Sequence, residues 1–181
     1  KQLYVFLIGL APTFTCAQQT TAPDSDQIRV WVTLGTGLTS FGDWVVGSDI
    51  NVSKGTHLYS VDYQFYPGAF NLFFCDTPEP SMEQFSAFYG YIKHERTRFW
   101  YAKAGLSYLL YSSASDTLPS TGWFSCDKYI YETTRHFGLP IEIGAGVKLW
   151  AISFQAYGSV LISGPVTTAN LGLKVGLGYL K

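Results

Sequence analysis

The chain has 181 residues, which is enough for one domain. Charged residues make up 14% of it and aromatic residues 17%, a balance that is unusual for a soluble protein. A net charge of −1 and the lack of a basic run exclude the electrostatic footprint of a nucleic-acid-binding protein, so we expect no nucleic-acid partner. The three cysteines are far apart without metal-ligand spacing, and we expect neither a metal site nor a cofactor.

Residues 1–17 have the pattern of a cleavable signal peptide. Lys1 gives a short basic start, residues 3–10 (LYVFLIGL) are apolar, and residues 15–17 fit a small-x-small cleavage site. The apolar run is too short to cross a bilayer as a helix, although a buried strand or an N-terminal anchor helix would also fit it. We therefore predict a signal peptide over 1–17 and a polar lead-in over 18–27.

Period-two alternation recurs along the rest of the chain, and no segment of useful length has a helical period. The predicted strands cover residues 28–39, 44–53, 56–66, 83–93, 98–111, 135–147, 151–161 and 167–180. Because a tilted membrane strand needs about 9–11 residues, these lengths fit strands that span a bilayer.

The two faces of these predicted strands differ in polarity. One face is rich in aromatic and aliphatic residues and carries no charge, whereas the other has glycines, small polar residues and charges. A solvated face would carry many Lys and Glu, so the polar face is typical of a cramped barrel interior. The strand at 83–93 is ambiguous, because Phe88 falls on its small-residue face. Six charges, three of each sign, are predicted to pair in the interior: Arg29, Asp49, Asp62, Lys103, Glu142 and Lys174.

The predicted connections differ in length between the two ends of the barrel. Those at 54–55, 94–97 and 148–150 are short, whereas the two long ones, 67–82 and 112–134, share the opposite end. Short turns at one end and long loops at the other are typical of membrane barrels. Aromatic residues near strand ends are predicted to form girdles at the membrane surfaces: Trp44, Tyr91, Trp100, Trp150 and Tyr179. We therefore predict an all-β fold, a closed antiparallel eight-stranded transmembrane β-barrel.

Two segments, 137–142 (FGLPIE) and 172–179 (GLKVGLGY), look like closing hairpins of known barrels. Over residues 28–181 the chain resembles the small eight-stranded outer-membrane barrel proteins (OmpA/OmpX type), and more closely the barrel proteins of Bacteroidetes-like bacteria. The resemblance implies a place in the outer membrane of a Gram-negative bacterium, contact with its lipid and insertion by the barrel-assembly machinery. Both mature termini are expected in the periplasm, and we expect a monomer.

Cys75 and Cys126 fall in the two long connections, which share one end of the predicted barrel. In an oxidising compartment they could form a loop-to-loop disulfide, provided that their backbones come close enough. Two separate thiols are the alternative, and the spacing along the chain leaves both open.

Three histidines raise the alternative of a lipid-directed enzyme. Some eight-stranded outer-membrane enzymes that trim or acylate lipid A use a His and a Ser near the lipid-facing rim. His136 is predicted near the outer rim with the serines of 112–115, whereas His57 and His94 are predicted at the other end. No Ser/His/acid spacing identifies a nucleophile, so polar loop or girdle histidines are favoured and no catalytic residue is assigned.

An eight-stranded barrel is just wide enough for side chains to fill it, so the six charges are predicted to be structural rather than channel-lining. The favoured hypothesis is a non-enzymatic protein with a structural or surface-interaction role. Its loops 67–82 and 112–134 would bind an extracellular ligand or protein, since the second holds several aromatic residues. A lipid A-modifying enzyme and a soluble lipocalin-like carrier remain as alternatives.

Overall fold

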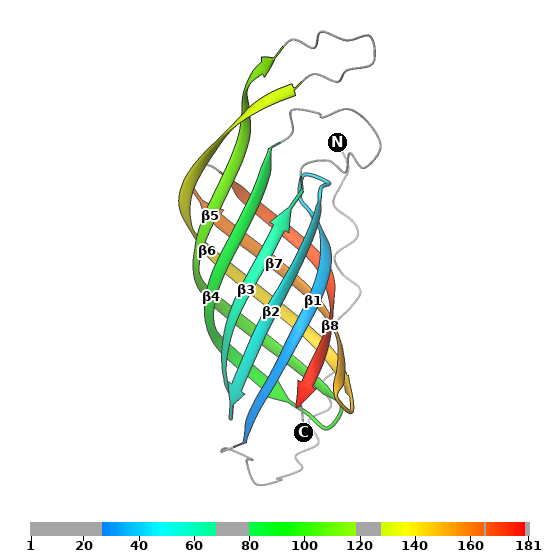
Figure 1. Cartoon of the computed structure of the whole chain (residues 1–181). Coiled ribbons are helices and arrows are strands. Elements are labelled where there is room, and N and C mark those ends of the chain that lie inside the picture. Colours follow the sequence, from blue (N-terminus) through cyan, green and yellow to red (C-terminus); the bar gives the residue numbers. More distant parts are fainter. Residues whose placement is uncertain (1–26, 68–79, 119–127, 165, 180–181) are drawn as a thin grey trace, which may run out of the picture.

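The computed structural model describes residues 27–67, 80–118, 128–164 and 166–179. They form antiparallel strands that close into one barrel, in which β1 pairs with β8 (Figure 1). The strands are β1 (Ile28–Thr39), β2 (Trp44–Lys54), β3 (His57–Tyr66), β4 (Ser81–His94), β5 (Arg98–Leu118), β6 (Lys128–Leu149), β7 (Ile152–Ser163) and β8 (Thr167–Tyr179). Within these ranges no helix is long and apolar enough to cross a membrane. The predicted closed eight-stranded barrel is thus confirmed, while the predicted signal peptide (1–17) lies outside the described residues.

The two ends of the barrel differ in their connections. At the turn end lie the short connections 55–56, 95–97 and 150–151, together with the start of β1 and the end of β8 (bottom of Figure 1). The opposite end, which we call the loop end, holds the ends of β1, β3, β5 and β7 and the starts of β2, β4, β6 and β8. This arrangement has the short-turn and long-loop asymmetry that the sequence predicted.

The strand register gives the barrel a fixed stagger. When the pairing is followed around the barrel from Ile28 on β1, it returns to β1 at Leu38, ten residues further along (38 − 28 = 10). A barrel with such a stagger must tilt its strands against its axis, as Figure 1 shows. Closure also leaves no open sheet edge in the barrel wall.

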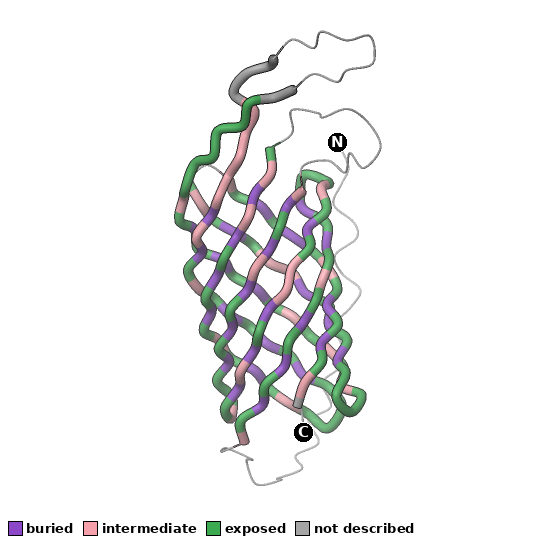
Figure 2. The backbone as a smooth tube through the Cα atoms, viewed as in Figure 1, coloured by how far each residue is buried: buried purple, intermediate pink, exposed green. Residues whose placement is uncertain are grey.

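Side chains alternate between an exposed apolar outer face and a buried polar inner face (Figure 2). Leu106 and Leu171, for example, are 69% and 74% exposed, whereas Asp49 and Glu142 are 2% and 1% exposed. This polarity is the reverse of that of a soluble barrel and is the pattern of a transmembrane one. The alternative of a soluble lipocalin-like carrier, which needs an apolar interior, is therefore wrong.

Strands β5 and β6 are much longer than predicted. The sequence placed their ends at residues 111 and 135, but the two strands stay paired until Leu118 meets Lys128. The apolar alternation fades there, where the two strands project beyond the barrel rim (Figure 1). A register shift between Ala114 and Asp116 also breaks the period-two pattern.

The turn between β6 and β7 has an unusual backbone. Trp150 adopts a positive φ of 62°, a region that side chains other than glycine rarely enter. Its side chain is 96% exposed at the turn end. A strained backbone at this turn thus accompanies an exposed aromatic ring at the barrel rim.

Candidate functional site

An ion cluster occupies the middle of the barrel interior. The ammonium group of Lys174 on β8 lies 2.6 Å from Asp49 Oδ2 on β2 and 2.8 Å from Glu142 Oε1 on β6. Lys103 on β5 lies 3.3 Å from the same Glu142 oxygen and 3.7 Å from Asp49 Oδ2. Asp62 on β3 completes the cluster, with Oδ2 3.8 Å from the nitrogen of Lys174. These five side chains join strands that are far apart in the sequence.

Neutral donors add hydrogen bonds to the carboxylates of the ion cluster. Thr33 and Asn51 both donate to Asp49 Oδ1. The hydroxyl of Tyr101 donates to Glu142 Oε1 over 2.8 Å. Since each buried ion costs several kcal/mol unless it is paired, these donors help to stabilise the charges.

Aromatic rings cover the two ammonium groups. The nitrogen of Lys103 lies 4.5 Å from the centre of the Phe88 ring, and that of Lys174 lies 4.5 Å from the Tyr157 ring. Phe88, whose direction the sequence left ambiguous, is therefore an inward residue. Both contacts have the geometry of cation–π interactions.

The ion cluster carries more negative than positive groups. It holds three carboxylates, Asp49, Asp62 and Glu142, against the two ammonium groups of Lys103 and Lys174. Asp62 Oδ1 and Glu142 Oε2 have no hydrogen-bond partner in the described part of the chain. The three carboxylates thus face only two cations, and Asp62, whose ion pair with Lys174 is the longest of the cluster, is the most weakly held acid.

Two apolar clusters close the interior on either side of these charges. The lower plug, at the turn end, consists of Trp31, Leu58, Ile92, Phe99 and Tyr101. The upper plug, near the loop end, consists of Val45, Tyr66, Met82, Leu109 and Leu161. The charged side chains between the plugs are at most 5% exposed. This interior is a packed core rather than an aqueous channel.

Arg29 differs from the other five predicted interior charges. It is buried at the start of β1, at the turn end, where its guanidinium donates to Gln27 Oε1 over 3.1 Å. None of the ion pairs of the ion cluster includes it. The structure therefore brings five of the six predicted residues together and places the sixth, Arg29, at the turn end of the barrel.

The predicted girdle residues lie at both ends of the barrel wall. Trp44 is exposed at the loop end, whereas Tyr91, Trp100 and Trp150 are exposed at the turn end. The rings of Tyr91 and Trp100 are in contact, with centroids 5.3 Å apart. Tyr179 is the last residue of β8, at the turn end. Further ring pairs on the outer face, which only the register reveals, are Tyr59 with Tyr89, Tyr63 with Phe85, and Tyr108 with Phe137.

The histidines do not form a catalytic group with an acid in any contact of the described residues. His57 Nδ1 lies 2.8 Å from the hydroxyl of Tyr89 on the outer face, and His136 Nε2 lies 2.9 Å from Thr134 Oγ1. His94 faces Ser53 at 3.4 Å, but that serine is fully buried. Cys75 and Cys126 lie outside the described residues.

A two-stranded ribbon projects from the barrel at the loop end. It comprises residues 113–118 of β5 and 128–132 of β6, which pair only with each other (Figure 1). Strand β4 stops pairing at Ser112, and β7 does not pair before Gly138. The backbone edges of the ribbon thus have no neighbour among the described strands.

Side chains hold the base of the ribbon together across its two strands. Ser112 and Thr133 share a hydrogen bond of 2.8 Å, and Thr134 Oγ1 donates to the carbonyl of Tyr111 over 3.3 Å. Ile130 and Tyr131, further along β6, are 45% and 44% exposed. The ribbon therefore combines polar groups with exposed apolar ones, as binding surfaces do.

Solved structures with the same fold include three bacterial proteins. Neisserial surface protein A (NspA) is 13% identical with a TM-score of 0.57, over 84% of this chain and 96% of that one. The N-terminal β-barrel domain of Pseudomonas aeruginosa OprF is 13% identical with a TM-score of 0.58, over 83% and 97%. Ail, the attachment invasion locus protein of Yersinia pestis, is 10% identical with a TM-score of 0.51, over 84% and 96%.

These likenesses establish the fold. The chain is an all-β, closed, antiparallel eight-stranded barrel that matches transmembrane barrels of the outer-membrane type. No protein-family model matches the sequence, and no curated protein matches it.

Proposed function

We propose that this protein is a non-enzymatic barrel of the outer membrane of Gram-negative bacteria that binds an extracellular partner through its β5–β6 ribbon. The observation that carries the proposal is the projection of the ribbon beyond the barrel rim with both of its edges unpaired among the described strands. The barrel below it is filled by the ion cluster and the two plugs, which supports an anchoring role for the barrel and a recognition role for the ribbon.

Free strand edges suit a partner that adds a strand. An unpaired edge presents a row of N–H and C=O groups, and many recognition domains bind extended peptides by pairing with such an edge. The irregularity between Ala114 and Asp116 limits uncontrolled pairing on the β5 side, because bulges twist an edge away from its neighbours. The edge of β6 from Tyr131 to His136 is the better candidate contact, since its pairing with β5 is regular in register.

The solved barrels with similar folds support the location and suggest which activity to test first. They come from Gram-negative outer membranes or surfaces, and one of them is by its name an attachment and invasion protein. Attachment to an extracellular protein is therefore the first activity to measure. Lipid A modification is less well supported, because in the described part of the chain the serine that His94 faces, Ser53, is fully buried and closed to a substrate.

A ribbon-shortened variant tests the proposal. Residues 113–132 are replaced by Asn-Gly, which joins the paired residues Ser112 and Thr133 in a two-residue hairpin turn. Cells that display the wild-type protein or the variant are compared for adherence to surfaces coated with fibronectin, laminin or mucin. Lys54→Gln, a change of an exposed residue at the turn end, is the matched control.

The proposal predicts that the variant folds and reaches the cell surface but loses adherence, while Lys54→Gln keeps it. Surface biotinylation of intact cells checks that the three proteins are displayed equally. Equal adherence of the wild type and the ribbon-shortened variant on every coating, at equal display, would overturn the binding role. A changed lipid A profile in cells that express the wild type would instead favour the enzyme.

A further inference from the structure

A shallow groove crosses the outer wall of the barrel near the turn end, over β5, β6, β7 and β8. Its volume is about 740 Å³. One row of paired residues forms its floor and sides: Trp100, Ala145, Ala156 and Leu173. The two alanines are small and pair side by side between the bulky Trp100 and Leu173, so the wall is hollowed there.

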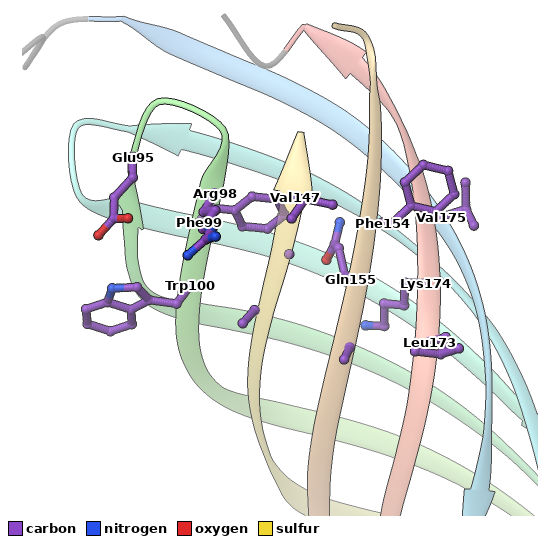
Figure 3. Close-up of a pocket in the computed structure, with 13 residues that line it drawn as sticks. Glu95, Arg98, Phe99, Trp100, Val147, Phe154, Gln155, Leu173, Lys174 and Val175 are labelled. Carbon is purple, nitrogen blue, oxygen red and sulfur yellow. The ribbon is translucent and has the colours of Figure 1, made fainter. Parts of the chain in front are cut away.

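The groove has an apolar length and a charged end. The next row of paired residues towards the turn end is Arg98, Val147, Phe154 and Val175. Val147, Phe154 and Val175 continue the apolar lining of the groove. The guanidinium group of Arg98 lies at the β5 side of the groove (Figure 3). An apolar trough with a cation at its membrane-surface end matches an acyl chain joined to an anionic headgroup.

The charges around the turn end are mostly positive. In the described part of the chain, the exposed or half-buried ionisable Lys, Arg, Asp and Glu side chains at this end are Lys54, Lys93, Glu95, Arg96, Arg98 and Lys148. Five are cations and one, Glu95, is a carboxylate. Basic clusters at a membrane surface attract anionic lipid, so the turn end is complementary to an anionic leaflet.

Two of these cations flank the tryptophan of the groove. Lys93 on β4 is the direct pairing partner of Trp100 on β5, and Arg98 precedes Trp100 on the same outer face. Tryptophan favours the headgroup level of a bilayer, because its ring is apolar and its N–H is polar. A phosphate next to Trp100 would therefore meet Arg98 and Lys93 at the depth where lipid headgroups lie.

We propose that this groove binds one anionic phospholipid, with an acyl chain over Ala145 and Ala156 and the phosphate at Arg98 and Lys93. The site rests on the membrane location in the proposed function, but it does not depend on the ribbon. Glu95 lines the same end of the groove and repels an anion. Neutralising the two residues should therefore change lipid binding in opposite directions. Removing the charge of Arg98 weakens binding, and removing the charge of Glu95 strengthens it.

Lipid quenching of tryptophan fluorescence tests the site. The full chain is folded into phosphatidylcholine vesicles that contain either brominated phosphatidylglycerol or, at the same mole fraction, brominated phosphatidylcholine. The proposal predicts stronger quenching by the anionic lipid, and Trp100→Phe removes this excess. Arg98→Gln reduces the local enrichment of phosphatidylglycerol about fivefold, which corresponds to about 1 kcal/mol for one cation near anionic lipid. Glu95→Gln increases it.

Lys54→Gln is the matched control, because Lys54 is also an exposed turn-end cation but belongs to β2, outside the groove. A specific site predicts that this variant keeps the excess quenching. Equal quenching by the two lipids, or an equal loss in Arg98→Gln and Lys54→Gln, would overturn the site. Heat-modifiable migration of each protein reports insertion into the vesicles separately, so failure of the lipid site is distinguishable from failure of the membrane barrel.

Discussion

Lys174 and Asp49 meet across the barrel interior, with Nζ 2.6 Å from Oδ2, although they are 125 residues apart in the chain. This contact links β8 to β2 through the interior rather than through backbone pairing, because β1 lies between these strands in the sheet. Closure of the barrel is what brings the two residues together. The ion cluster is therefore available only to the folded state.

Loss of Lys174 should destabilise the barrel strongly. Lys174→Met leaves Asp49 and Glu142 with one fewer buried cation, and breaking a buried pair from one side costs about 3–5 kcal/mol. The free energy of unfolding in urea, measured by tryptophan fluorescence in one detergent, checks this. Lys54→Met, at an exposed position, should change it by less than about 0.5 kcal/mol. Similar values for the two variants would refute a stabilising role for the ion cluster.

Two carboxylates of the ion cluster should respond differently to neutralisation. Asp62→Asn balances the charges and retains an acceptor for Gln64, so stability should stay the same or rise. Asp49→Asn removes the closest partner of Lys174 and should cost about 1–3 kcal/mol. Urea unfolding at neutral pH measures both. If Asp62→Asn proves the more damaging change, the account of an excess carboxylate is wrong.

A glycine in the barrel wall should not tolerate a methyl group. At Gly105 an added Cβ would lie 2.8 Å from the carbonyl carbon of Ala87 and 2.9 Å from the Cα of Phe88. These are backbone atoms that cannot move aside, so Gly105→Ala should cost about 1–3 kcal/mol through overpacking. Gly164→Ala, where the added atom meets open space, is the matched control. Equal stability of the two variants would contradict the packing described for the wall.

The barrel should not conduct ions. The lower and upper plugs close both sides of the ion cluster, so no continuous water path crosses the interior. Planar bilayers that contain the purified protein should show no stable conductance steps under conditions in which a 16-stranded porin does. Reproducible steps from the purified protein would mean that the plugs open.

Much of the barrel follows from the sequence, because lipid imposes a period-two pattern wherever a strand crosses the membrane. Strand β8, with alternating leucines and glycines, is the clearest case, and its predicted span of 167–180 differs from the structure by one residue at its end. The polar face likewise identified the five members of the ion cluster. Tyr101 and Thr33 lie on that same face, so the pattern already contained a signal for these two partners.

What could not be predicted depends on the environment or on register. The ribbon projects beyond the barrel wall, and its strands lack the apolar alternation that marks the others. Arg29 shares the polar face with the ion cluster, but it is the second residue of β1 and therefore lies at the turn end, away from the cluster. The groove arises because Ala145 and Ala156 fall side by side, which only the pairing of β6 with β7 reveals.

The central claim is that the exposed apolar face contacts lipid while the charged face is sealed inside. Fractionation of cells that express the full chain, followed by an alkaline carbonate wash and electrophoresis with and without boiling, tests it most directly. The account predicts that the protein stays in the outer-membrane pellet after the wash and that the unboiled form migrates faster than the boiled one. Recovery of the folded protein in the soluble fraction without detergent would contradict it.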